Sequence, residues 1–152
     1  MSKKRFKLFP NILIGTTPYS TLFPEYAKHC SPEQIDSLHR YYCHKLGVPD
    51  ILKTLTWRFE KRFRATLGQA EYWDDEKTGE TQHLIRYATN YWIPLGPAAR
   101  KNLIAHEVCH LAVEKLFGHG NKVNGIKVND HGYYWKLLMF ACDEDPKVEM
   151  CC

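Results

Sequence analysis

Two histidines with a glutamate between them form the part of the sequence whose spacing can support chemistry, the segment Ile104-Ala105-His106-Glu107-Val108-Cys109-His110. On an α-helix, residues four apart lie one turn above each other, so the rings of His106 and His110 can reach one ion. In the H-E-x-x-H pattern the histidines bind zinc and the glutamate is the general base of a hydrolase. The segment therefore predicts a zinc site with His106 and His110 as ligands and Glu107 as the base.

The residues around this motif are those of a helix long enough to hold it. Pro97 suits a first helical turn, and Gly118 suits a left-handed stop after the last turn. We therefore expect a helix over residues 97–117. At spacing i, i+4, i+7 and i+11, one stripe of this helix holds His106, His110, Val113 and Phe117. The competing interpretation is an amphipathic helix that merely places two histidines on its core face.

Upstream of this helix, apolar and polar residues alternate with the period of β-strands. The clearest strand runs from Thr54 to Glu60. A second is expected near Ala65 to Trp73, with Gly68 as a bulge. After a charged turn over residues 74–80, a third strand is expected from His83 to Ile93, where Pro94 ends it.

Helices are expected on both sides of these elements. Ser31-Pro32-Glu33 has the features of a helix start, and Gly47 closes that segment, whose His39 and His44 are interpreted as surface residues. After a loop over residues 118–129, a last helix is expected with Asn129 or Asp130 as its cap. The predicted fold class is α+β: a small three-stranded sheet, the H-E-x-x-H helix and flanking helices.

Length and composition favour one globular domain. The chain has 152 residues, of which 44% are hydrophobic and 25% charged, and no segment has the ~20 apolar residues of a membrane span. We divide it into an N-terminal extension (1–30), the domain (31–145) and a C-terminal tail (146–152). No secretory signal is visible, and the six cysteines show no C-x-x-C spacing. These features predict free thiols and an intracellular protein, cytoplasmic or nuclear rather than secreted.

The order of the motifs resembles the SprT-like (Spartan-type) zinc metalloprotease family. The matching residues are His106-Glu107-Val108-Cys109-His110 and then Asp130-His131-Gly132-Tyr133-Tyr134-Trp135-Lys136, and the resemblance covers about residues 32–142. It implies a zincin-like protease fold with a single Zn2+, bound by His106, His110 and His131, with Glu107 as the catalytic base. It also implies protein or peptide substrates, which in the best-known members are proteins crosslinked to DNA.

The chain departs from the family pattern in two ways. The interval between His110 and His131 is longer than in the relatives, so an insertion is expected beside the active site. Where a zinc ribbon would begin, only Cys151-Cys152 is found. With a net charge of +4, and a basic face formed by Arg58, Lys61, Arg62 and Arg64, we expect at most weak nucleic-acid contact.

Two histidines compete for the place of third ligand. His119 follows Gly118 in a glycine-rich loop, whereas His131 lies at the start of a helix that can pack on the zinc helix. A ligand is held best on a rigid element with a hydrogen-bond acceptor nearby, and Asp130 adjoins His131. This argument and the family resemblance both favour His131, and they leave His119 as a mobile surface residue.

The predicted reaction is hydrolysis of a peptide bond by a zinc-bound water that Glu107 activates. The strand from His83 to Ile93 is the predicted binding site for extended substrate, by edge pairing. Tyr133, Tyr134 or a lysine could stabilise the oxyanion. Two alternatives remain: a non-catalytic zinc-binding module that engages protein or nucleic acid, and a zinc-dependent nuclease. Glu107 argues against the first, because a structural zinc site needs no base.

Overall fold

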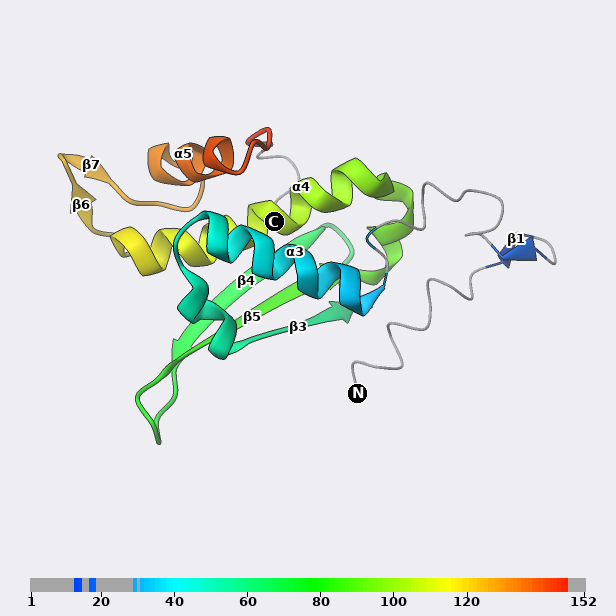
Figure 1. Cartoon of the computed structure of the whole chain (residues 1–152), viewed down its shortest axis with the longest axis horizontal. Coiled ribbons are helices and arrows are strands. Elements are labelled where there is room, and N and C mark those ends of the chain that lie inside the picture. The colour runs from blue at the N-terminus through cyan, green and yellow to red at the C-terminus, as the bar shows by residue number, and fades with distance from the viewer. Residues whose placement is uncertain (1–12, 15–16, 19–28, 30, 148–152) are drawn as a thin grey trace.

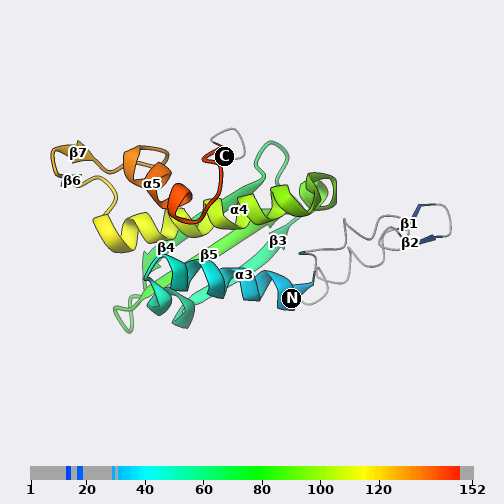
Figure 2. The same ribbon diagram turned by 45° about the horizontal axis from the view of Figure 1, so that its top comes forward.

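The part of the chain that the computed structural model describes, residues 13–14, 17–18, 29 and 31–147, has an α+β fold. Its elements are β1 (Leu13–Ile14), β2 (Thr17–Pro18), α3 (Pro32–Lys45), η2 (Pro49–Lys53), β3 (Leu55–Glu60), β4 (Gly68–Asp74), β5 (Thr81–Ala88), α4 (Thr89–Phe117), β6 (Lys122–Val123), β7 (Ile126–Lys127) and α5 (Tyr133–Ala141). Helices α3 and α4 cover one face of a three-stranded sheet, and α5 packs on α4 on the side away from that sheet (Figure 1 and Figure 2). The predicted class, with its three strands and flanking helices, is confirmed.

Part of the predicted division of the chain falls on residues outside this range. Most of the N-terminal extension (1–30) and the Cys151-Cys152 end of the tail are not among the described residues. Within the described part, none of the helices combines the length and the apolar character that a membrane crossing needs. Its cysteines Cys43, Cys109 and Cys142 are free thiols, as expected.

Helix α3 begins and ends close to where the sequence predicts. The Ser31 hydroxyl accepts from the Gln34 backbone N–H, and the Gln34 side chain accepts from the Ser31 N–H, which completes a capping box. Pro32 occupies the first turn. One prediction is wrong, because His39 is buried and its Nε2 lies 2.8 Å from the Tyr87 hydroxyl. His44 is exposed, as expected.

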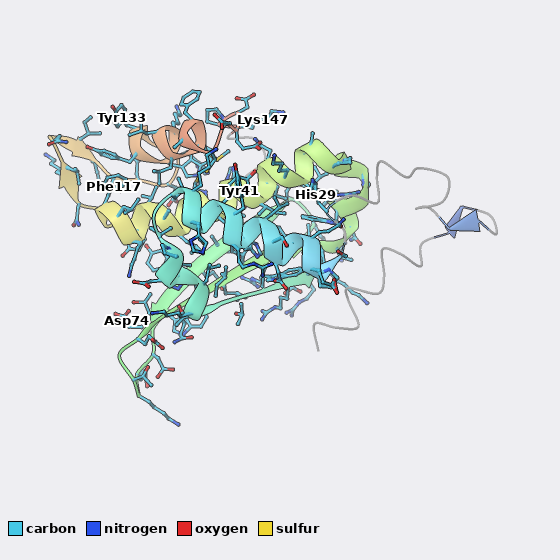
Figure 3. All side chains as sticks on the ribbon, viewed as in Figure 1. His29, Tyr41, Asp74, Phe117, Tyr133 and Lys147 are labelled. Carbon is cyan, nitrogen blue, oxygen red and sulfur yellow. The ribbon has the colours of Figure 1, made fainter. Side chains whose placement is uncertain are left out.

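The sheet has the strand order β3-β5-β4, with β3 parallel and β4 antiparallel to β5. Gly68 pairs with Tyr87 in regular register and is therefore not a bulge. The charged turn lies between β4 and β5, beyond Asp74, at one end of the sheet (Figure 3). Ile85 and Tyr87 on the central strand are fully buried, which fits a strand whose face is covered by helices.

The uncovered face of the sheet carries paired charges rather than a purely basic surface. Arg86 on the central strand donates to the side chains of Gln69 and Glu71, and it forms an ion pair with Glu60. Glu60 is also paired with Arg62 (Nε–Oε2 3.2 Å), one of the residues of the predicted basic face. The acids on this face therefore offset part of the expected positive charge.

Helix α4 begins earlier than the sequence predicts, and the third strand is correspondingly shorter. The strand ends at Ala88, and Thr89 begins a first helical piece that is separated from the rest by a non-helical residue, Gly96 (φ 79°, ψ 167°). The β-forming residues of this piece are helical because Trp92 is fully buried, and its carbonyl accepts from Arg100 Nε at 2.7 Å. Tertiary burial here overrides local strand propensity.

The predicted loop over residues 118–129 contains a small hairpin. Strands β6 and β7 pair around Asn124 and Gly125, which both have positive φ (51° and 78°). Asn-Gly is a preferred sequence for the two-residue turn of such a hairpin. The last helix then begins at Tyr133 with Gly132 as its N-cap and no side-chain cap, so Asn129 and Asp130 do not cap it.

The chain after α5 is fastened back onto α3 and α4. The Glu144 carboxylate accepts from the Tyr42 hydroxyl and from Asn102 Nδ2, both at 3.1 Å. Asn102 Nδ2 also donates to the Asp145 carbonyl at 2.9 Å, and Lys45 pairs with Asp143 at 2.9 Å. These contacts form the C-terminal clamp, which fixes the end of α5 against the two longer helices.

Candidate metal centre

Three histidines from two parts of the chain meet on the side of α4 that faces α5. His106 and His110 are one helical turn apart, and His131 comes from the segment just before α5. The Nε2 atoms of His106 and His131 are 3.4 Å apart, and one ligand atom from each of the three residues lies within 4.8 Å of the others. These nitrogens are close enough together to bind one metal ion.

Trp135 holds the three rings in place. Its ring centroid lies 4.7 Å from that of His106, 5.5 Å from that of His110 and 4.8 Å from that of His131. It is fully buried, and its Nε1 donates to the His106 backbone carbonyl at 3.3 Å. Trp135 was not predicted to contact the metal ligands. Its position one helical turn after His131 was the available signal.

The environment keeps the three imidazoles neutral. Burial, with His110 and His131 nearby, lowers the pKa of His106 to about 3, and a hydrogen bond with the Lys147 backbone acts weakly in the opposite direction. Burial and the neighbouring His131 lower the pKa of His110 to about 4. Burial also lowers the pKa of His131. Neutral imidazole is the form that binds a metal, so the cluster fits one without having to lose protons near pH 7.

Glu107 is fully buried beside this cluster. It lines a cavity of about 170 Å³ together with His110 and His131. On its other side, its Oε2 would lie only 2.7 Å from a Cβ placed on Gly68. A glycine in β4 therefore leaves room for the carboxylate. This role of Gly68 was not predicted, because the residue was interpreted as a bulge.

The remaining walls of the cavity come from β4, from Leu111 and Val113 on α4, and from the segments that flank the hairpin. Strand β4 contributes Gln69, Ala70 and Tyr72, and the flanking segments contribute His119 and Asp130. His119 lies outside the three-histidine cluster, and its Nε2 is 3.0 Å from Asp130 Oδ1. The structure thus brings together His106, His110 and His131, with Glu107 beside them, and places His119 apart.

The predicted substrate strand requires a correction. The segment His83 to Ile93 is strand only as far as Ala88, and that strand, β5, is the centre of the sheet with a partner on each side. A central strand has no free edge, so it cannot bind a peptide by edge pairing. The strand that lines the cavity is β4, an edge strand of the sheet.

Comparison with known proteins agrees with this arrangement. The SprT-like family matches residues 33–151, a span that includes the sheet, the three histidines and Glu107. No curated protein and no solved structure matches the chain. The family match covers most of the sequence. The chain therefore belongs to the SprT-like family.

Proposed function

We propose that this chain is a zinc-dependent endopeptidase of the zincin-like type, with Glu107 as its general base. The observation that carries the proposal is the position of Glu107, fully buried and in the wall of the cavity that His110 and His131 also line. A structural zinc site takes all its ligands from the protein and needs no carboxylate there. This favours an endopeptidase over a non-catalytic zinc-binding module.

His106, His110 and His131 would hold the metal through neutral ring nitrogens. Three protein ligands are typical of catalytic zinc sites, and nitrogen donors suit zinc better than magnesium or calcium, which prefer oxygen. When bound, zinc lowers the pKa of water towards ~7 and polarises a scissile carbonyl. Membership of the SprT-like family supports the same assignment.

Glu107 would move the proton during hydrolysis. Its carboxylate accepts a proton from the attacking water as the water oxygen bonds to the carbonyl carbon. The C–N bond then breaks, and the leaving amine receives the proton from Glu107. The close approach of Gly68 to the carboxylate limits its movement and so favours this proton transfer.

The substrate would lie along β4. Its backbone pairs with β5 on one side only, so its other edge can pair with an extended peptide beside the cavity. The family resemblance supports protein substrates, including proteins crosslinked to DNA. The net charge of +4 supports weak contact with the nucleic acid itself.

A metal analysis combined with a cleavage assay tests this function. Zinc-loaded protein is incubated with an unfolded protein and with a DNA-binding protein, each with and without single-stranded DNA. Glu107→Gln should keep its zinc and lose cleavage, while Glu33→Gln, an exposed change on α3, should cleave normally. Cleavage by Glu107→Gln at the wild-type rate would rule out the mechanism. A wild-type protein that binds zinc and cleaves nothing would favour the binding module.

A further inference from the structure

His119 is held in the cavity wall by contacts on both its backbone and its ring. Its backbone N–H donates to Glu114 Oε1 at 2.7 Å, and its Nε2 lies 3.0 Å from Asp130 Oδ1. Glu114 is also the hydrogen-bond partner of the Tyr72 hydroxyl on β4. His119 thus belongs to a connected set of polar groups from three sides of the cavity.

The loop that carries His119 is also anchored. Gly118 and Gly120, which flank it, have φ values of 78° and 88°, a backbone region that favours glycine. The Gly120 N–H donates to the Val128 carbonyl at 2.8 Å, and Asn121 Nδ2 donates to the Phe117 carbonyl at 3.1 Å. These bonds tie the loop to the end of α4 and to the base of the hairpin. The His119 side chain is 44% exposed, so it lies at the surface as the sequence predicts, and it also lines the cavity.

Its position makes His119 a group that substrate would meet. It lines the same cavity as Glu107, His110 and His131, and it lies near enough to His110 to influence that residue's pKa. It is not one of the three clustered histidines. Because Asp130 engages Nε2, the other ring nitrogen, Nδ1, is left for a ligand.

The two tyrosines expected near the reacting carbonyl are placed elsewhere. The Tyr134 hydroxyl donates to the Val123 carbonyl at 2.6 Å. Tyr133 is 54% exposed, on the side of α5 turned away from α4 (Figure 3). Of the other polar side chains that line the cavity, Gln69 accepts from Arg86 through its Oε1, and the Tyr72 hydroxyl contacts Glu114.

We propose that His119, as the imidazolium, is a further catalytic residue: its Nε2–H donates to Asp130, and its Nδ1–H donates to the carbonyl oxygen of the scissile bond as negative charge develops on that oxygen. Asp130 is the positioning residue that holds Nε2. A donor aimed at developing charge stabilises the transition state more than the bound substrate. This inference rests on the proposed peptidase function and adds a residue to its machinery.

The test measures separately how each substitution affects metal binding, turnover and affinity for a mimic of the transition state. For wild type, His119→Ala and Asp130→Asn, we would measure zinc per chain, kcat and KM. In a Glu107→Gln background, we would compare the affinity for a substrate peptide with that for a phosphinic peptide, whose tetrahedral anionic centre resembles the transition state. His44→Ala, an exposed histidine on α3, is the matched control.

We expect His119→Ala to keep its zinc and its KM and to lose kcat by a factor on the order of 10²–10³, the usual cost of removing one such donor. Its affinity for the phosphinic peptide should fall by a similar factor while substrate affinity stays the same. Asp130→Asn should show a smaller loss of the same kind. An unchanged kcat, a loss confined to KM or a loss of zinc would each overturn the role of His119. A wild-type protein that neither cleaves nor prefers the phosphinic peptide would overturn the peptidase function as well.

Discussion

The carboxylate of Glu107 occupies space that any side chain at residue 68 would need. A Cβ added to Gly68 would come within 2.7 Å of Glu107 Oε2 and 3.2 Å of Leu103 Cδ1. Gly68 lies in β4 and Glu107 in α4, so the sheet and the helix are in close contact at the proposed base. The position of this carboxylate therefore depends on the absence of one methyl group.

Gly68→Ala should displace Glu107 and reduce cleavage by at least 10-fold while zinc binding is retained. The atoms nearest to the added methyl group belong to Glu107 and Leu103, and not to the three clustered histidines. It should also cost about 1–3 kcal/mol of stability through overpacking. A double-mutant cycle, followed by urea unfolding, checks the cause. In a Glu107→Ala background the same change should cost less. An equal cost in both backgrounds would show that the carboxylate is not the group displaced.

Removing the metal should lower stability. His106 and His110 lie on α4 and His131 precedes α5, so a bound ion joins two separate elements and its binding energy stabilises the fold. At a free zinc concentration 100 times Kd, the gain is about 2.7 kcal/mol. We expect one zinc per chain and a fall in Tm on chelation. In His131→Ala, chelation should no longer lower Tm, whereas in His119→Ala it should lower Tm as in the wild type.

The buried His39 should make stability fall as the solution becomes acidic. Burial lowers its pKa from 6.5 to about 3, so between these values the unfolded chain binds a proton that the native chain does not. The contribution of His39 to the free energy of unfolding therefore falls by about 1.4 kcal/mol for each pH unit below 6.5. Urea unfolding of the chelated protein at pH 7.5, 6 and 5 should show the advantage of wild type over His39→Gln shrinking with acidification. His44→Gln, which changes an exposed histidine, should show a constant difference from wild type.

Binding to single-stranded DNA should be weak and sensitive to salt. The net charge is only +4, and Arg62 and Arg86 on the open face of the sheet are paired with acids. If three phosphates are contacted, affinity should fall roughly 40-fold between about 50 and 200 mM salt. Fluorescence anisotropy at several salt concentrations measures this. Tight binding whose affinity does not change with salt concentration would reveal a dedicated site that these charges do not explain.

The spacing of residues that are close in the sequence predicted most of the site and much of the fold. His106 and His110 are four apart, and a helix turns every 3.6 residues, so any helix through this segment brings their rings together. The strand Leu55–Glu60 was predicted from its alternation of apolar and polar residues, and the helix Pro32–Lys45 from its Ser31 cap. Each of these features depends on residues that are neighbours in the sequence.

The features that were missed depend on residues far apart in the chain. Trp92 lies among β-forming residues, but its burial against Phe59, Tyr87 and Arg100 holds its segment in a helix. The central place of β5 follows from pairing with β3 and β4 together, which periodicity cannot reveal. The contact of Gly68 with Glu107 and the pairing of His119 with Asp130 likewise exist only once the chain has folded.

Helix α5 is held at its start through His131 and at its end by the C-terminal clamp, and this matters for the protein without its metal. The C-terminal clamp, through Glu144 and Asp143, does not involve the three histidines, so it persists when the ion is removed. The start of α5 and the hairpin before it lose the restraint that His131 provides. Local opening should therefore begin at residues 118–131 and stop short of residue 142, with faster amide hydrogen exchange in that segment alone. A newly made chain that has not yet acquired zinc would thus be most open to proteolysis at the rim of the proposed active site.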